Sequence, residues 1–177
     1  MYWDKWSFGA KARIVLFQSL YTPLKYLPFP LGEFLRFALL KLFLKKLGRG
    51  GWVRDGCMIS HPENIAIGDR VFINENVCLS GAGGIEIGNN VAIGHRSSII
   101  SDDHGFENKT ALIVEQQRKL AKVTIQDDVY FGCNVVVLKG VTIGKGAVIG
   151  AHSLVTKDIP EYAIACGIPA QVIRYRT

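Results

Sequence analysis

Large apolar residues recur at every sixth position over much of the chain. The positions are Ile67, Ile73, Leu79, Ile87, Ile93, Ile99, Ile125, Phe131, Val137, Ile143, Ile149 and Val155, and glycine follows six of these twelve. A period of six fits neither an amphipathic helix nor a simple alternating strand. It predicts a short strand and a turn, repeated so that strands stack and the apolar positions form one internal column.

The step between two registers of this pattern is eight residues rather than six. Val53 and Ile59 extend the pattern backward, again with an eight-residue step to Ile67. Early coils are therefore expected to repeat every twenty residues, and later ones every eighteen. We expect a repeat domain over residues 51–160, followed by a C-terminal tail at 161–177.

The repeat is interrupted once, by a polar and charged segment at residues 101–122. Inserted loops in repeat proteins often carry function. This loop contains Ser-Asp-Asp-His-Gly-Phe, and His104 is its one histidine. Imidazole can serve as a general base near neutral pH, so His104 is a candidate catalytic residue, although a single histidine in a polar loop can also be an ordinary surface residue. Asp102 and Asp103 could orient the imidazole, or could cap the turn with their side chains.

The net charge of +6 is concentrated at the front of the chain. Residues 1–50 contain nine basic and two acidic residues, whereas the remainder contains twelve and thirteen. We expect this segment to form a helix, a break at Pro23, Pro28 and Pro30, and a second helix from about Leu31 to Leu47, ended by Gly48. The segment has no apolar run long enough to span a bilayer and no evident signal-peptide cleavage site.

Two interpretations of residues 1–50 remain open. The segment could lie on an anionic membrane surface, with Tyr2, Trp3, Trp6 and Phe8 at the interface. It could instead be a helical cap that packs on the rest of the protein or on another subunit, with its lysines extended into water. Nucleic acid is not an expected partner, because the basic residues alternate with Leu, Phe and Tyr rather than forming a polar stripe.

The four cysteines, at positions 57, 78, 133 and 166, have no Cys-x-x-Cys spacing. This excludes zinc-ribbon and thioredoxin-type motifs. We expect buried free thiols and a reducing, cytoplasmic location.

Three stretches, IGNNVAIGHRSSI, VTIQDDVYFGCNVVVLKGVTIGKGAVIGAHSLVTKDIP and GIPAQVIR, carry a specific family resemblance. The chain resembles the bacterial hexapeptide-repeat acyltransferases, in particular the maltose/galactoside, serine and capsule or exopolysaccharide O-acetyltransferases. This resemblance implies an all-β fold, a left-handed parallel β-helix of hexapeptide repeats with an N-terminal helical segment and one long inserted loop. It also implies a homotrimer that binds acetyl-CoA between neighbouring subunits, with no metal.

The same resemblance assigns roles to particular residues. His104 would be the catalytic base. Acceptor-binding positions would be Asn74 and Asp103, although Asn74 could instead be a corner residue that tolerates a left-handed conformation. Positions matching the donor site are Cys133, Ala151, Thr156, Lys157 and Arg174. Gln171 stands where some relatives have Arg, which leaves a phosphate contact there in doubt.

The leading hypothesis is an acetyl-CoA-dependent O-acetyltransferase that modifies a sugar of a bacterial surface polysaccharide or its lipid-linked precursor, at the inner face of the cytoplasmic membrane. Alternatives are an acetyltransferase for another small acceptor (an amino sugar, serine or an antibiotic), a gamma-carbonic-anhydrase-like metalloenzyme, and a non-enzymatic trimeric module. The metalloenzyme needs converging histidines, but those at 61, 95, 104 and 152 include no closely spaced pair.

Overall fold

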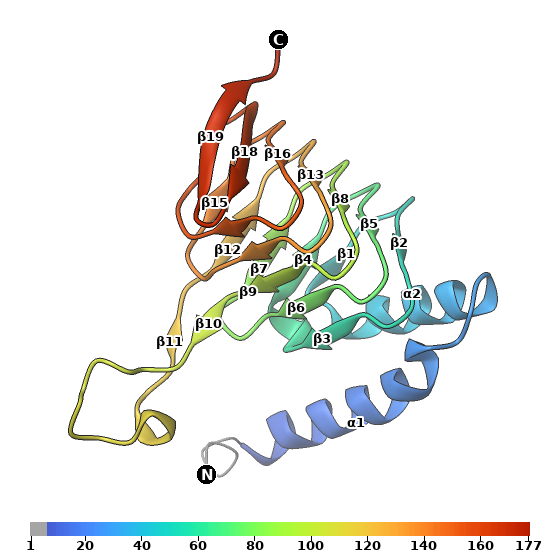
Figure 1. Ribbon diagram of the computed structural model, residues 1–177. Helices are drawn as coiled ribbons and strands as arrows, with labels where there is room; N and C mark the ends of the chain where they lie inside the picture. The colour runs from blue at the N-terminus through green and yellow to red at the C-terminus, as the bar shows by residue number, and fades with distance from the viewer. Residues whose placement is uncertain (1–6) are drawn as a thin grey trace.

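The computed structural model describes residues 7–177. Helices α1 (Phe8–Lys25) and α2 (Leu31–Phe43) come first, and short strands dominate the rest. The strands stack coil upon coil, with the helices at one end of the stack and the C-terminus at the other (Figure 1). The chain is therefore a parallel β-helix with a helical segment at its N-terminal end, which confirms the expected architecture.

Each coil contributes one strand to each of three sheets, which we call A, B and C. Sheet A contains β1 (Lys46–Leu47), β4 (Ile65–Ile67), β7 (Ile85–Ile87), β12 (Val123–Ile125) and β15 (Thr142–Ile143). Sheet B contains β2 (Trp52–Val53), β5 (Phe72–Ile73), β8 (Ala92–Ile93), β13 (Tyr130–Phe131), β16 (Val148–Ile149), β18 (Ala163–Gly167) and β19 (Ala170–Tyr175). Sheet C contains β3 (Met58–Ser60), β6 (Cys78–Ser80), β9 (Ser98–Ile100), β14 (Val136–Val137) and β17 (Leu154–Val155). Stacked strands pair in parallel, except that β19 pairs antiparallel with β18.

The sixfold apolar pattern forms the core. In sheet B, Ile73 pairs with Ile93, Ile93 with Phe131, and Phe131 with Ile149. All twelve positions of the pattern are buried. Burying each such side chain contributes about 1.5–3 kcal/mol, so the internal columns supply the main stabilisation of a coil that has short strands and many turns.

Two kinds of residue shape the corners. The glycine after a strand is required by close stacking: a Cβ on Gly132 would lie 2.5 Å from the backbone nitrogen of Ala151 in the next coil. The left-handed conformation falls two residues later, at positions such as Asn134 (φ 57°) and His152 (φ 60°). The glycines of the pattern therefore serve close approach, while mostly Asn, Asp and other polar residues take the positive φ.

The inserted loop leaves the β-helix at the corner between sheets C and A, which we call the C–A corner. Val137 pairs with Ile99 of the preceding coil and with Val155 of the following coil, so the repeat resumes in register after the loop. The residues of the inserted loop therefore fall between Ile99 and β12. The eight-residue steps of the early coils occupy the same corner, where one of them forms a short 3₁₀ turn, η2 (Pro62–Asn64). The loop thus extends a corner that is already wide in the preceding coils.

Helix α2 ends at Phe43, earlier than the expected end at Leu47. Lys46 and Leu47 instead form β1 and pair with Ala66 and Ile67 of β4. Pairing with an existing sheet satisfies the backbone groups of these residues, and so overrides the helical pattern of the sequence.

The helical segment caps the open end of the β-helix. Phe17, Tyr21, Leu40, Phe43 and Leu44 are buried in the same apolar cluster as the coils. This observation favours the cap interpretation for the inward faces of both helices. None of the helices within residues 7–177 is long and apolar enough to cross a bilayer. Of the aromatic residues proposed for a membrane interface, Tyr2, Trp3 and Trp6 lie outside the described residues.

Arg36 joins the cap to the first coil. Its side chain is 1% exposed. The guanidinium group donates hydrogen bonds to the backbone carbonyls of Val53 (3.0 Å), Leu24 (2.8 Å) and Leu27 (2.7 Å). One buried cation thus binds α1, the turn after it and strand β2 together.

Candidate active site

His104 follows directly after the first stem of the inserted loop. The stems are β10 (Asp102–Asp103) and β11 (Lys119–Leu120), which pair antiparallel. Beyond them the loop projects away from the stacked coils (Figure 1) and contains the 3₁₀ turn η3 (Ile113–Glu115). The His104 side chain is exposed in the single chain, so it is accessible to a substrate.

Asp103 holds the backbone around His104. One carboxylate oxygen accepts the backbone N–H of His104 (2.8 Å), and the other lies 3.2 Å from Nζ of Lys139 in the next coil. The side chain therefore acts as a turn cap, one of the two roles considered for it. Contact between Asp103 and an acceptor stays a prediction.

The predicted donor-site residues lie along the two edges of sheet C. Cys133 and Ala151 follow β13 and β16 at the corner between sheets B and C, which we call the B–C corner. Thr156 and Lys157 follow β17 at the C–A corner, the corner from which the loop leaves. Ala151, Thr156 and Lys157 are exposed, and Cys133 is half-buried. The fold thus aligns these residues in two columns and does not gather them into one cluster within a single chain.

Arg174 lies apart from both columns. It belongs to β19, opposite Ile164 of β18, and its side chain is exposed. Within the described residues, its guanidinium group donates one long hydrogen bond, to the carbonyl of its neighbour Tyr175 (3.5 Å). A cation in this state is available for an anionic ligand.

Asn74 lies at the B–C corner, directly after β5, at the position that Gly132 and Gly150 occupy in later coils. Its amide nitrogen donates a hydrogen bond to the carbonyl of Ile93 in the next coil (2.9 Å). The left-handed residue of this corner is Asn76 (φ 59°), so the suggestion that Asn74 takes that conformation is wrong. The Asn74 amide instead links two successive coils through this hydrogen bond, and a role of Asn74 in acceptor binding stays a prediction.

Two polar pairs near these columns were not predicted from the sequence. Lys139 of the C–A corner pairs with Asp103, and His95 of the B–C corner pairs with Glu75 (Nδ1 to Oε2, 2.6 Å). His95 and Glu75 occupy equivalent positions in successive coils, twenty residues apart. The repeat aligns these two positions, so the sequence pattern is the signal that places them side by side.

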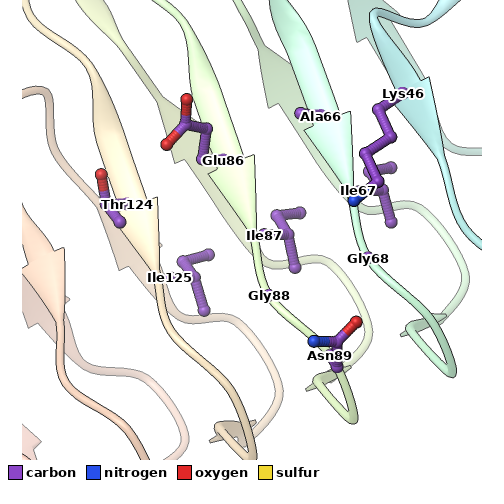
Figure 2. A pocket seen from close by; sticks show the side chains of 10 residues that line it. All are labelled: Lys46, Ala66, Ile67, Gly68, Glu86, Ile87, Gly88, Asn89, Thr124 and Ile125. Atoms are coloured by element: carbon purple, nitrogen blue, oxygen red, sulfur yellow. The ribbon is translucent and has the colours of Figure 1, made fainter.

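A shallow groove of about 370 Å³ lies elsewhere, on the outer face of sheet A. Figure 2 shows its lining from β1, β4, β7 and β12: Lys46, Ala66, Ile67, Gly68, Glu86, Ile87, Gly88, Asn89, Thr124 and Ile125. Its carboxylate, Glu86, pairs with Lys122 (2.9 Å), and this hydrogen bond lowers the pKa of Glu86. The groove contains none of the predicted site residues and no histidine, so the loop region remains the candidate active site.

All four cysteines are free thiols, as expected, but they differ in burial. Burial raises the pKa of Cys57 to about 12 and also raises the pKa of Cys78. Cys133 is half-buried, and Cys166 is exposed, so the expectation of four buried thiols is wrong. Cys166 alternates with the inward-facing Ala165 in β18 and therefore faces outward. Within residues 7–177, no three His, Cys, Asp or Glu side chains are grouped as metal ligands.

A parallel β-helix of six-residue repeats points to the class of the hexapeptide-repeat transferases. Residues 122–157 match the family described as bacterial transferase hexapeptide (six repeats). The galactoside O-acetyltransferase of Escherichia coli K12 is 34% identical over 139 residues, which cover 78% of this chain and 68% of the relative. This chain belongs to the hexapeptide-repeat transferase family.

Further relatives agree with this assignment. The putative colanic acid biosynthesis acetyltransferase WcaF of Escherichia coli K12 is 32% identical over 138 residues, covering 78% of this chain and 73% of the relative. The crystal structure of a hexapeptide-repeat acetyltransferase of Vibrio cholerae O1 biovar eltor, VCA0836, complexed with acetyl coenzyme A, superposes with a TM-score of 0.86 at 28% identity and covers 96% of this chain and 90% of that one. The chain spans 45% of the length of one further curated relative, compared with 68% and 73% of the two named above.

Proposed function

We propose that the chain is an acetyl-CoA-dependent O-acetyltransferase that acts on a sugar hydroxyl, with His104 as general base. The observation that carries the proposal is the accessible histidine on the one loop inserted into the coils of a hexapeptide-repeat transferase. Relatives named for galactoside and for colanic acid biosynthesis support a sugar acceptor. The VCA0836 complex supports acetyl-CoA as the donor.

The proposed reaction is a direct transfer. His104 removes the proton from the acceptor hydroxyl as its oxygen attacks the thioester carbonyl carbon. The carbon–sulfur bond then breaks, the CoA thiolate leaves, and the imidazolium returns the proton to the sulfur. A base of this kind contributes typically about 10²–10⁴-fold to the rate. Because the thioester is already activated, no covalent acyl-enzyme at Cys133 is needed.

The donor site is proposed to form between copies of the chain. Lys157 and Arg174 are exposed cations that suit the phosphates of CoA. Cys133 and Ala151 lie at the B–C corner, along one edge of sheet C. The inserted loop and Thr156 lie at the C–A corner, along the other edge. A homotrimer would place the loop edge of one chain beside the B–C edge of its neighbour and so complete the groove.

The outward face of α1 is proposed to contact an anionic membrane. Apolar residues on this face are left uncovered, including Phe8 (87% exposed), Val15 (54%), Leu16 (53%) and Leu20 (44%). Lysines and arginines in the same segment give it a strong positive charge. This surface would hold the enzyme at the inner face of the cytoplasmic membrane, where a lipid-linked precursor of a surface polysaccharide is presented.

The activity is tested by measuring CoA thiol release from acetyl-CoA with a panel of acceptors. The panel contains free hexoses, galactosides, amino sugars, serine and polyprenyl-linked sugars, and product mass spectrometry distinguishes ester from amide. Acceptor-dependent release with a sugar hydroxyl supports the proposal. Release with serine or an amine alone would reassign the acceptor, and absence of both release and acetyl-CoA binding would refute the enzymatic assignment.

The membrane contact is tested by flotation of the full chain with vesicles containing phosphatidylglycerol. Replacing Leu16 and Leu20 by Glu should abolish flotation, because it places charges in the apolar stripe. Ile173→Glu, an exposed site in β19 at the other end of the molecule, is the matched control and should float normally. Flotation of the double variant at the wild-type level would refute the contact.

A further inference from the structure

The base of the inserted loop contains an ion pair whose carboxylate is buried and whose guanidinium group is partly exposed. Asp102, in the outgoing stem, is 5% exposed, and its carboxylate pairs with the guanidinium group of Arg118 at the start of the returning stem. The hydroxyl of Ser80, one coil below, donates a hydrogen bond to the same carboxylate (2.8 Å). Asp102 therefore contacts both ends of the loop and the body of the β-helix at once.

A second set of bonds fastens the residue before this pair. The Ser101 hydroxyl donates to the carbonyl of Ser80 (2.6 Å) and accepts the N–H of Gly83 (2.9 Å). The carbonyl of Ser101 accepts the N–H of Ala121 at the far end of the loop (3.0 Å). These neutral bonds already close the loop at its base, so the ion pair is an additional constraint rather than the sole closure.

The cost of burying charge indicates that the ion pair has a positional role. Taking a carboxylate out of water is expensive, and a buried ion pair often adds little stability compared with well-packed apolar residues. What such a pair does provide is a defined geometry, because the guanidinium group and the carboxylate bind in few orientations. Here the geometry is imposed two residues before His104, and Asp103 between them is held in turn by Lys139.

We propose that Asp102 and Arg118 form a latch that positions His104 for general base catalysis. This inference rests on the proposed role of His104. Asp102 is a positioning residue, since it acts through the loop backbone and does not itself reach the substrate. The latch fixes where the β10 stem ends, and the turn capped by Asp103 then sets the direction in which the imidazole projects.

The latch should affect turnover more than donor binding. A displacement of about 1 Å in a reacting group can lower the rate about 100-fold. Asp102→Asn keeps the shape of the side chain and its bond to Ser80 but removes the charge that holds Arg118. We expect kcat to fall roughly 10- to 100-fold while KM for acetyl-CoA stays within about twofold, because none of the predicted donor-site residues lies in the inserted loop.

The matched control is Asp127→Asn. Asp127 is a half-buried carboxylate that accepts a bond from the backbone N–H of Asn89 (2.6 Å), and it lies at the corner between sheets A and B, away from the loop. We expect this variant to lose thermal stability by a similar amount but to retain kcat within about twofold. A loss of kcat in both variants would show that Asp102 acts only through general stability and would overturn the proposal.

Arg118 provides the complementary test. Arg118→Gln should lower kcat as Asp102→Asn does, and the double variant should be no worse than the more impaired single variant, because both substitutions break one pair. Arg118→Lys retains the charge and should recover part of the lost kcat. Multiplicative losses in the double variant, or wild-type kcat in Asp102→Asn, would overturn the latch.

The same set of variants includes His104→Ala. If that variant retains near-normal transfer, the proposed function of His104 fails, whatever Asp102 does. If it is inactive while Asp102→Asn turns over normally, the base stands and only the latch is refuted.

Discussion

Replacing Arg36 by Met tests whether the helical segment is an integral part of the folded body. Met has a similar length and is apolar, so the substitution removes the charge and the hydrogen bonds while still filling the space. The carbonyls of Val53, Leu24 and Leu27 would lose the donor that they share. The bond to Val53 is buried, and the Leu24 carbonyl keeps its bond from the N–H of Leu27 (3.2 Å).

The magnitude follows from these three bonds. A hydrogen bond to a charged group contributes about 1.5–3 kcal/mol, and each buried acceptor left unpaired costs about 1–3 kcal/mol. Burial of the Met side chain and release of the desolvated charge offset part of this loss. We expect a net destabilisation of roughly 3–5 kcal/mol, which is large on the scale of single substitutions.

The assay is guanidinium chloride unfolding at a fixed protein concentration, followed by tryptophan fluorescence. Arg13→Met is the control, because Arg13 is exposed and donates one bond, to the carbonyl of Phe43 (3.2 Å). It should cost less than about 1 kcal/mol. A loss below about 1 kcal/mol for Arg36→Met would refute the idea that the cap is locked to the first coil.

Three further outcomes are expected. An uncharged thiol reagent at pH 8 should label Cys166 in the native protein but reach Cys57 only after unfolding, as measured by mass spectrometry. Because folding raises the pKa of Cys57 to about 12, the un-ionised Cys57 thiol contributes its full share to the free energy of unfolding below about pH 8.5. That share is lost as the pH rises toward 12. Gly132→Ala should lower Tm by several degrees, with a cost of about 1–3 kcal/mol, since its Cβ would strike the next coil, whereas Gly9→Ala has open space and should not lower Tm. Lys157→Ala should raise KM for acetyl-CoA several-fold and weaken its dependence on salt, while kcat should change little.

The six-residue repeat predicts the fold from the sequence alone. Because every coil buries the same positions, the sequence pattern alone places Ile93 and Phe131 in one column, and their pairing confirms this prediction. The end of α2 could not be found in this way. Lys46 and Leu47 continue a helical pattern, and only the presence of β4 beside them makes strand pairing the better choice.

The sequence predicts individual residues of the candidate site, but it does not predict which of their side chains pair with one another. His104 stood out because it lies at the single break in the repeat. The partner of Asp102 did not, because Arg118 is sixteen residues away within a loop that has no period, and the pair forms only when the two stems meet. In the proposed homotrimer, residues that act together with a second copy of the chain would likewise be placed by assembly and not by the repeat.

His104 is proposed to be the base for acetyl transfer. The most direct measurement compares the kcat of wild type and His104→Ala with the sugar acceptor found in the screen, alongside acetyl-CoA affinity by calorimetry and Tm. We predict that kcat falls at least about 100-fold while Tm and acetyl-CoA affinity remain at their wild-type values. Transfer by His104→Ala at a rate close to wild type would contradict this role of His104.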